Sequence, residues 1–578
     1  MIKTLLASVR EYKKPALLSF SAIVGEVIIE CLIPFITASL ITKIQNNVEM
    51  GELIKIGLLL VLMAFVSLGC GALAGHASAK ASAGFAKNLR TDMFDRIQRF
   101  SFENIDRFSS ASLVTRMTTD VGNAQMSFMM IIRVAVRAPL MFVFAVVMAS
   151  IMGGKLALTF VVVIPVLLAG LIIVTRKAMP AFHRVFKKYD KLNESVEENV
   201  RAMRVVKGFA REDYEKQKFG KAAEDIRADF TKAERIVAFN NPLMQACLYF
   251  NMVFVLFIGS KLVITASGVE VGHLSAMLTY GFQVLMSLMM LSMIYVILTI
   301  SLESMRRITE VLKEEPTLKN PEKPITQLAN GSIDFEDVSF KYSKTADNFA
   351  LSGVNLHIAS GMTVGLIGGT GSSKSTLVQL IPRLYDVTEG VIRVGGNDVR
   401  DYDIESLRDA VAMVLQKNQL FSGKIKDNLR WGNENATDEE LVEACKLAQA
   451  HEFITAFPDG YDTYIEQGGT NVSGGQKQRL CIARALLKKP KILILDDSTS
   501  AVDTRTDALI RMGFKRYIPD TTKIIIAQRI ASVEDADLIV IMDNGRVVSQ
   551  GTHEELLKSS PIYREIYEEQ TTGRDENE

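Results

Sequence analysis

The chain has 578 residues, of which 66 are Lys or Arg and 65 are Asp or Glu, so its formal net charge is +1. This length predicts about two to four domains, and the balanced charge excludes a protein that binds nucleic acid through bulk positive charge. Hydrophobic residues make up 48% of the sequence, and the mean hydropathy of +0.18 is high for a soluble enzyme, which indicates an apolar part joined to a polar one.

Six long apolar segments lie in the N-terminal half of the chain. Each reaches or exceeds the ~20 residues that a helix needs to cross a ~30 Å hydrocarbon core. We predict membrane-spanning helices, because a soluble core, which is the alternative, rarely contains so many such runs in one half of a chain. The first segment has no small-residue cleavage site and is expected to be retained. The predicted spans are residues 16–41, 54–75, 133–153, 155–175, 243–265 and 274–300.

Lys and Arg residues are concentrated in the N-terminal segment and in the long connections that follow the second and fourth predicted spans. The other connections, 42–53, 153–155 and 266–273, are short and carry few positive charges. By the positive-inside rule, the N-terminus and both long connections are cytoplasmic. An even number of spans returns the C-terminal half to the same side, so we expect a multi-pass protein of a bacterial-type plasma (inner) membrane.

The two long connections contain charged and apolar residues at helical spacing, over Ala86–Phe100 and Phe182–Lys221. Turn-prone residues interrupt these connections at Phe108–Ser112 and Arg201–Gly208, and we expect a short helix at each tip. Their apolar faces favour docking onto another domain over a solvated helix without a partner.

A linker with three prolines among charged and polar residues covers Glu314–Gly331 and marks a domain boundary. Strands rich in β-branched residues then alternate with helical stretches, which is the pattern of a parallel α/β sheet. The expected fold is therefore a membrane all-α domain with long cytoplasmic extensions, fused to an α/β domain. We expect the membrane domain over 1–312, the linker over 313–331, the α/β domain over 332–570 and an acidic tail over 571–578.

A glycine-rich loop follows the predicted strand Thr363–Ile367 and precedes a helical stretch. A phosphate needs close backbone approach, several N–H donors and a fixed cation, and such a loop ending in Lys and a hydroxyl residue provides them. We expect Lys374 to contact the β- and γ-phosphates of a nucleotide and Ser375 to ligate Mg²⁺. Gly usually precedes this Lys, whereas here the residue is Ser373. The loop and the first helical residues are Gly368, Gly369, Thr370, Gly371, Ser372, Ser373, Lys374, Ser375 and Thr376.

Two further motifs accompany this loop. The apolar run Lys491–Asp496 predicts a buried strand of a P-loop domain that delivers the Asp496 carboxylate to the metal. Between the loop and this strand, a helix opens at Ser473, Gly474, Gly475 and Gln476. Behind six predicted spans, these motifs resemble the ATP-binding cassette (ABC) exporters of type IV, in which a half-transporter joins six membrane helices to a nucleotide-binding domain. The resemblance covers almost the whole chain.

The resemblance implies roles for further positions. Tyr342 matches the aromatic residue that stacks on adenine, with a strand-edge Tyr as the alternative. Gln416 matches the glutamine that contacts Mg²⁺ and senses the membrane domain, and Asp503 matches the loop at the dimer interface. Coupling segments that resemble those of the family lie at about Ser112–Asp120 and Arg201–Arg211.

Three positions of the predicted ATP site depart from the family pattern. Ser373 replaces Gly. Asp497 stands where the family has the Glu that acts as general base, and one methylene fewer withdraws the carboxylate by about 1.5 Å. Gln528 stands where the family has His, and an amide can hydrogen-bond a γ-phosphate but cannot carry a proton. Asp497 and Gln528 are the catalytic positions of this site.

All three departures lie in the ATP site that this chain itself would form, and not in its signature. In the family, two cassettes sandwich two ATP molecules head to tail, and the signature of each cassette acts on the ATP of its partner. The signature of this chain, Ser473–Gln476, is intact. We therefore expect a heterodimer with a second ABC half-transporter, in which the ATP site of this chain is degenerate and hydrolyses weakly while its signature serves the partner's site. The alternative is a self-sufficient, slow homodimer that uses Asp497 as the base.

Some polar residues lie inside the predicted spans. Glu26 and Glu30 are one helical turn apart, and intramembrane carboxylates seldom face lipid. A role toward a cationic substrate or a proton is conceivable, but we favour a structural hydrogen bond or ion pair to another helix. Arg133 and Arg137 are expected to snorkel to the cytoplasmic boundary. Further candidates for a substrate cavity are Asn240, Asn251, Met286 and Met290, with interhelical hydrogen bonds and packing as the alternatives.

The resemblance thus implies ATP-driven multidrug or lipid efflux, with ATP and Mg²⁺ as cofactors, amphipathic substrates and no nucleic acid partner. A membrane regulator that binds nucleotide without transporting is a rival from another class, and the intact signature disfavours it. An importer is disfavoured because importers usually keep membrane and cassette domains on separate chains.

Overall fold

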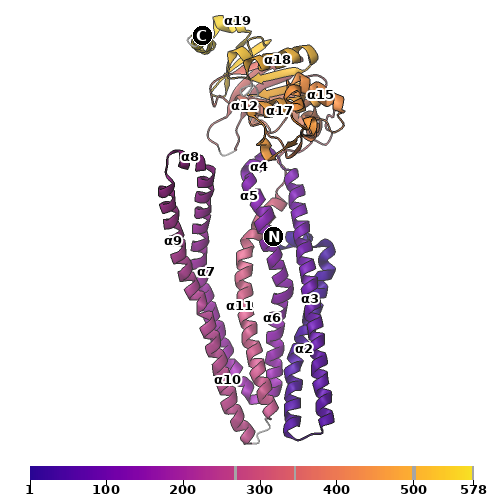
Figure 1. Ribbon diagram of the computed structural model, residues 1–578, viewed down its shortest axis with the longest axis vertical. Coiled ribbons are helices and arrows are strands. Elements are labelled where there is room, and N and C mark those ends of the chain that lie inside the picture. Colours follow the sequence, from indigo (N-terminus) through magenta and orange to yellow (C-terminus); the bar gives the residue numbers. More distant parts are fainter. Residues whose placement is uncertain (266–269, 344–345, 498–502, 576–578) are drawn as a thin grey trace. The chain divides into compact units, whose positions relative to one another are not determined.

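The computed structural model describes residues 1–265, 270–343, 346–497 and 503–575. The chain divides into two compact units (Figure 1). The first, here called the helical unit, comprises Met1–Arg99 and Ser109–Glu314. The second, here called the sheet unit, comprises Phe100–Phe108 and Glu315–Glu578. A short segment from the N-terminal half of the sequence therefore belongs to the sheet unit.

The helical unit consists of long helices that run side by side (Figure 1). Six helices of the described residues are long and apolar enough to cross a membrane, and each overlaps one predicted span. This confirms the predicted membrane all-α fold. The helices are α1 (Ile2–Ala7), α2 (Lys13–Gln45), α3 (Met50–Gln98), α5 (Ser110–Thr115), α6 (Val121–Gly153), α7 (Leu158–Arg201), α8 (Met203–Gly208), α9 (Glu212–Ala238), α10 (Asn240–Ile264) and α11 (Val271–Lys313), with the short turns η1 (Arg10–Tyr12), η2 (Arg116–Asp120) and η3 (Gly154–Ala157).

Helices α7 and α9 lie side by side and are joined at one end by the short helix α8 (Figure 1). This confirms the expected short helix at the Arg201–Gly208 tip. At the end of α8, Ala210 adopts a left-handed φ of +49°, which reverses the chain into α9.

The other predicted coupling segment was misplaced. The residues that join the sheet unit are Phe100–Phe108, which contain α4 (Phe102–Phe108), and not Ser112–Asp120. Ser109 has a left-handed φ of +55° and separates α4 from α5. Ser112–Asp120 packs within the helical unit instead, where Arg116 Nη1 donates to the carbonyl oxygen of Arg307 at 2.7 Å. The charged pattern of this segment reflects ion pairs to α11.

The sheet unit has the predicted α/β architecture. Its main sheet has the strand order β12-β11-β3-β10-β9-β6 and is parallel except at β12, and a second, antiparallel sheet has the order β2-β1-β4-β5. The strands are β1 (Ile333–Phe340), β2 (Leu351–Ile358), β3 (Thr363–Ile367), β4 (Glu389–Val394), β5 (Asn397–Asp398), β6 (Val411–Val414), β7 (Gly423–Lys424), β8 (Tyr464–Ile465), β9 (Ile492–Asp496), β10 (Thr522–Ile526), β11 (Leu538–Asp543) and β12 (Arg546–Gly551). Its helices besides α4 are α12 (Lys374–Leu380), α13 (Ile404–Ala410), α14 (Ile425–Arg430), α15 (Asp438–Leu447), α16 (His451–Thr455), α17 (Gly474–Leu487), α18 (Thr504–Tyr517), α19 (His553–Ser559) and α20 (Pro561–Asp575).

The strand order fixes where the site forms. Strands β3, β10, β9 and β6 are neighbours and parallel, so their carboxyl ends meet at one edge of the sheet. Strand β9 is buried along its whole length, as its continuous apolar run predicts. The four loops that leave this edge carry the residues that the sequence marked for nucleotide chemistry.

Candidate nucleotide site

The glycine-rich loop connects the end of β3 to the start of α12. A Cβ added at Gly368 would come within 2.1 Å of the Met542 carbonyl oxygen, so only glycine fits against β11. Lys374 Nζ donates to the carbonyl oxygens of Gly368 and Gly369 at 2.8 and 2.9 Å. Burial lowers the pKa of the Lys374 ammonium, and the charge of Asp496 opposes this effect. The lysine thus folds back over the loop, where it can exchange carbonyl contacts for phosphate oxygens.

Ser373 has a left-handed φ of +71° immediately before α12. For a residue with a Cβ, the left-handed backbone conformation is less stable than the right-handed conformation by roughly 1–2 kcal/mol. The substitution of Ser for the usual Gly therefore places strain at the point where the loop turns into the helix.

Asp496 ends β9 and is buried, with 4% of its surface exposed. Its Oδ1 accepts a hydrogen bond from Ser375 Oγ at 3.0 Å. Burial raises the pKa of the Asp496 carboxyl, and the Ser375 hydrogen bond opposes this shift. A hydroxyl and a carboxylate at this separation are oxygen donors of the kind that Mg²⁺ prefers, so the pair fits a magnesium ion beside the phosphate loop.

Asp497 is held by two amide side chains. Its Oδ2 accepts hydrogen bonds from Gln528 Nε2 at 2.7 Å and from Gln416 Nε2 at 3.3 Å. The three residues leave the ends of β9, β10 and β6. The structure thus brings together the two predicted catalytic positions and the predicted Mg²⁺-contacting glutamine.

Tyr342 follows β1 and lies next to the first turn of α12. Its hydroxyl is 2.9 Å from Thr376 Oγ1, and 46% of its surface is exposed. An exposed ring beside the phosphate loop suits stacking on a base. Sequence reasoning missed Tyr385, whose ring packs edge-on against Tyr342 with centroids 5.3 Å apart. No spacing pattern marks Tyr385, because the contact depends on β1 and β4 being neighbours in the antiparallel sheet.

The signature residues open α17 as a reciprocal cap. Ser473 Oγ accepts from the Gln476 backbone N–H at 3.3 Å, and Gln476 Oε1 accepts from the Ser473 N–H at 2.9 Å. This cap holds Gly474 and Gly475 in the first helical turn. Asp503 in turn caps α18 by accepting from the Thr506 N–H at 2.9 Å. The rest of the predicted interface loop, 498–502, lies outside the described residues.

Comparison with known proteins decides the family. Residues 16–308 match the ABC transporter transmembrane region, and residues 351–500 match the ABC transporter family. The chain is 36% identical over 573 residues to YfiB of Bacillus subtilis, an uncharacterized ABC transporter ATP-binding protein, with 99% of each chain covered. The protein is an ABC transporter.

Other relatives place this ABC transporter among the exporters. It is 32% identical over 490 residues to the ATP-dependent lipid A-core flippase of Desulfotalea psychrophila, with 83% of this chain and 84% of that protein covered. Its fold matches a bacterial Atm1-family ABC exporter with ATP bound, at a TM-score of 0.82 and 24% identity over 98% of each chain. The ABC transporter is therefore a multi-pass membrane protein with an exporter fold, and its ATP-binding domain couples ATP hydrolysis to transport.

Three charged residues within the membrane helices of this ABC transporter form a cluster. Arg137 Nη1 of α6 donates to Glu26 Oε1 at 2.6 Å, and its Nη2 contacts Glu30 of α2 at 2.8 Å. This confirms the favoured interpretation of the two carboxylates as an ion pair to another helix. The prediction that Arg137 snorkels to the boundary was wrong, because intramembrane charges seek partners and two carboxylates one turn apart attract the guanidinium inward.

The remaining cavity candidates are spread over α10 and α11. Asn251 is buried, and it approaches Gly281 so closely that an added Cβ there would lie 2.2 Å from its Nδ2. Asn240 and Met286 are half-buried, whereas Met290 is 37% exposed. Asn251 therefore fills the space that a glycine leaves between two helices. The alternative considered for it was an interhelical hydrogen bond, but its buried Oδ1 accepts none from the described residues.

Proposed function

We propose that this ABC transporter is one half of a heterodimeric exporter of amphipathic drugs or lipids, and that its own ATP site is degenerate. The pairing of Asp497 with the Gln528 and Gln416 amides at 2.7 and 3.3 Å carries the proposal. A general base needs an oxygen directed at the attacking water. Here two amide donors engage Oδ2, and neither amide can carry a proton afterwards.

The site is nevertheless suited to hold nucleotide. Tyr342 would stack on adenine, and Lys374 would contact the β- and γ-phosphates over the loop Gly368–Thr376. Ser375, Asp496 and Gln416 would hold Mg²⁺, which neutralises phosphate charge when bound. Asp497 and Gln528 would then contribute little hydrolysis, so ATP at this site serves mainly to hold the two cassettes together.

The signature Ser473–Gln476 would act on ATP in the partner's site, with Asp503 at the interface. The reciprocal cap of Ser473 and Gln476 supports this role, because it presents the exposed first turn of a 14-residue helix. Hydrolysis at the partner's site would reset the transporter after ATP-driven closure has opened the cavity outward.

An amphipathic substrate is supported by the similarity to a lipid A-core flippase. The substrate cavity in the membrane domain would be lined by Glu26, Glu30, Asn240, Asn251, Met286 and Met290. We place the protein in the plasma (inner) membrane, with the N-terminus and the nucleotide-binding domain cytoplasmic. We assign residues 1–312 to the transmembrane domain, 313–331 to the linker, 332–570 to the nucleotide-binding domain and 571–578 to the tail.

A slow homodimer is the second candidate. It is favoured by the position of Asp497, which directly follows the Asp496 carboxylate at the end of β9. In that case Asp497 would act as base once ATP has displaced the Gln416 and Gln528 amides.

Two measurements test these candidates. First, a complex purified from its native membrane through a tag on this chain is expected to contain a second six-span chain in a one-to-one ratio, by mass and chain content. Second, Asp497→Asn should change the ATP turnover of that complex by less than about twofold, whereas Gly474→Asp, which blocks the signature, should abolish it. A complex of this chain alone whose turnover Asp497→Asn abolishes would overturn the heterodimer.

A further inference from the structure

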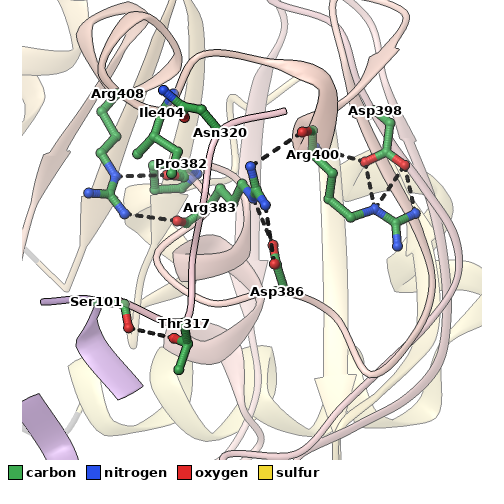
Figure 2. Close-up of polar contacts among 10 residues, drawn as sticks. All are labelled: Ser101, Thr317, Asn320, Pro382, Arg383, Asp386, Asp398, Arg400, Ile404 and Arg408. Atoms are coloured by element: carbon green, nitrogen blue, oxygen red, sulfur yellow. Dashed lines mark hydrogen bonds and ion pairs between the residues drawn. The ribbon is translucent and has the colours of Figure 1, made fainter. Parts of the chain in front are cut away.

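Helix α4 is fastened to the start of the linker within the sheet unit. Asn104 is buried and donates through Nδ2 to the Glu315 carbonyl oxygen at 3.1 Å. Its Oδ1 accepts from the backbone N–H groups of Ser101 at 3.1 Å and Thr317 at 3.3 Å. The hydroxyls of Ser101 and Thr317 also meet at 2.5 Å (Figure 2). The chain enters α4 from α3 and leaves it into α5, so this small helix carries the covalent connection to the membrane helices.

Helix α4 contacts one tyrosine of the sheet unit through two of its side chains. Tyr385 donates its hydroxyl hydrogen to Asp106 Oδ2 at 2.7 Å, and its ring packs against Phe102 with centroids 6.0 Å apart. Burial raises the pKa of the Tyr385 phenol, and the neighbouring Asp106 carboxylate raises it further. The phenol therefore stays protonated and remains a donor to Asp106.

The same ring also contacts Tyr342, the residue proposed to stack on adenine. Tyr385 and Tyr342 are perpendicular, with an interplanar angle of 88° and centroids 5.3 Å apart. Phe340 completes the cluster 5.6 Å from Tyr385. Because the Tyr342 hydroxyl is also held at Thr376, these contacts fix the orientation in which Tyr342 presents its exposed ring.

Two arginines, the buried Arg383 and the half-buried Arg408, hold the backbone of residues 382–386, which include Tyr385 (Figure 2). Arg408 donates to the carbonyl oxygens of Pro382 at 3.4 Å and Arg383 at 3.0 Å. Arg383, which is 5% exposed, pairs with Asp386 at 2.7 Å and reaches the Arg400 carbonyl oxygen at 3.3 Å. A displacement of α4 is therefore transmitted to the Tyr385 ring and is not absorbed by its loop.

We propose that Tyr385 is a positioning residue that orients Tyr342 for adenine and links it, through Asp106, to α4. The proposal rests on the role of Tyr342 in ATP binding. Binding of the adenine base and the position of α4 are then thermodynamically coupled: ATP binding favours one position of α4, and that position of α4 raises the affinity for ATP. The Tyr385 ring orients Tyr342, and the Tyr385 hydroxyl connects to Asp106 of α4. Two substitutions therefore separate the two effects.

The test uses the full-length transporter in the complex purified with this chain. Cross-linking of ATP to this chain by ultraviolet light measures binding of the base. Protection of the peptide bond after Arg107 from trypsin, compared with and without ATP, reports whether α4 is held against the sheet unit. Tyr385→Phe keeps the ring and is expected to leave half-saturation of cross-linking within twofold while it abolishes protection. Tyr385→Leu also removes the aromatic edge and should raise the half-saturating ATP concentration by about threefold to tenfold.

Tyr402→Phe is the matched control, because it removes a buried phenol hydrogen bond to the Val394 carbonyl oxygen at 2.8 Å in the same unit. It should leave both readouts unchanged. Asp106→Ala should reproduce Tyr385→Phe, and the double variant should be no worse than either single one. Normal protection in Tyr385→Phe, or normal ATP binding in Tyr385→Leu, overturns the proposal. Because neither readout requires transport, a complex that binds ATP but moves no substrate would refute the proposed function alone.

Discussion

At the scale of single residues, the left-handed backbone conformation of Ser373 should lower the free energy of unfolding of the protein. Its φ of +71° costs a residue with a Cβ about 1–2 kcal/mol, and the greater unfolded-state freedom of glycine offsets about half of this. Ser373→Gly should therefore raise the free energy of unfolding by up to about 1 kcal/mol and tighten ATP binding. Thermal melting and ATP cross-linking of the purified complex measure the two effects.

The control for Ser373→Gly is the same substitution at Ser406, which lies inside α13. Ser406→Gly removes the hydrogen bond from Ser406 Oγ to Asp403 at 3.0 Å and places glycine in the first turn of the helix, so it should lower the melting temperature. Equal destabilisation by both substitutions would contradict the strain at Ser373.

The identity of the site residues could be predicted from the sequence, but their contacts could not. The run that ends in Asp496 and the loop that ends in Lys374 mark the site by residue type and spacing alone. That Gln416 and Gln528 both engage one oxygen of Asp497 depends on β6, β9 and β10 being neighbours, which is a property of the sheet order.

At the scale of elements, α2 and α6 are joined by the cluster of Arg137 with Glu26 and Glu30. Arg137→Met leaves two carboxylates without their cation in the membrane and should destabilise the protein by about 3 kcal/mol. Replacing all three residues with uncharged isosteres (Glu26→Gln, Glu30→Gln and Arg137→Met) should recover most of this loss. Melting temperatures in detergent test the rescue, and a triple variant less stable than Arg137→Met would show that the cluster is not an ion-pair network.

The elements themselves were largely predictable where a long periodic signal exists. Six apolar runs gave six long helices among the described residues, and the β-branched strands that follow in sequence gave a mainly parallel sheet, as expected. The turn at Ser109 falls within the turn-prone residues Phe108–Ser112, but helix α4 precedes that turn and was not predicted, because its seven residues are too few to show helical periodicity. The contact of Tyr385 with Asp106 joins residues far apart in sequence, so no local pattern encodes it.

At the scale of the whole molecule, the tip formed by α7, α8 and α9 is a candidate surface for contact with a second half-transporter. It exposes apolar side chains at Val200, Val205 and Phe209, which are 64%, 57% and 73% exposed. A long helix that extends to an apolar tip is suited to docking, and in the proposed complex of two half-transporters the partner's cassette would offer an acceptor surface. Phe209→Asp should therefore uncouple ATP turnover from transport and lower transport at least about tenfold, because burying an unpaired charge in an apolar contact is costly.

Lys221→Ala is the control for this last substitution, since it changes the net charge by the same unit at an exposed position on α9. It should leave transport unchanged, and ATP cross-linking to this chain should be normal in both variants because the tip lies outside the residues that hold nucleotide. Normal transport by Phe209→Asp would show that the apolar tip is not a docking surface. Loss of ATP binding in the same variant would instead mean that the substitution unfolds the protein, and Phe209→Ser, which removes the ring without adding a charge, would then decide whether the exposed ring itself is required.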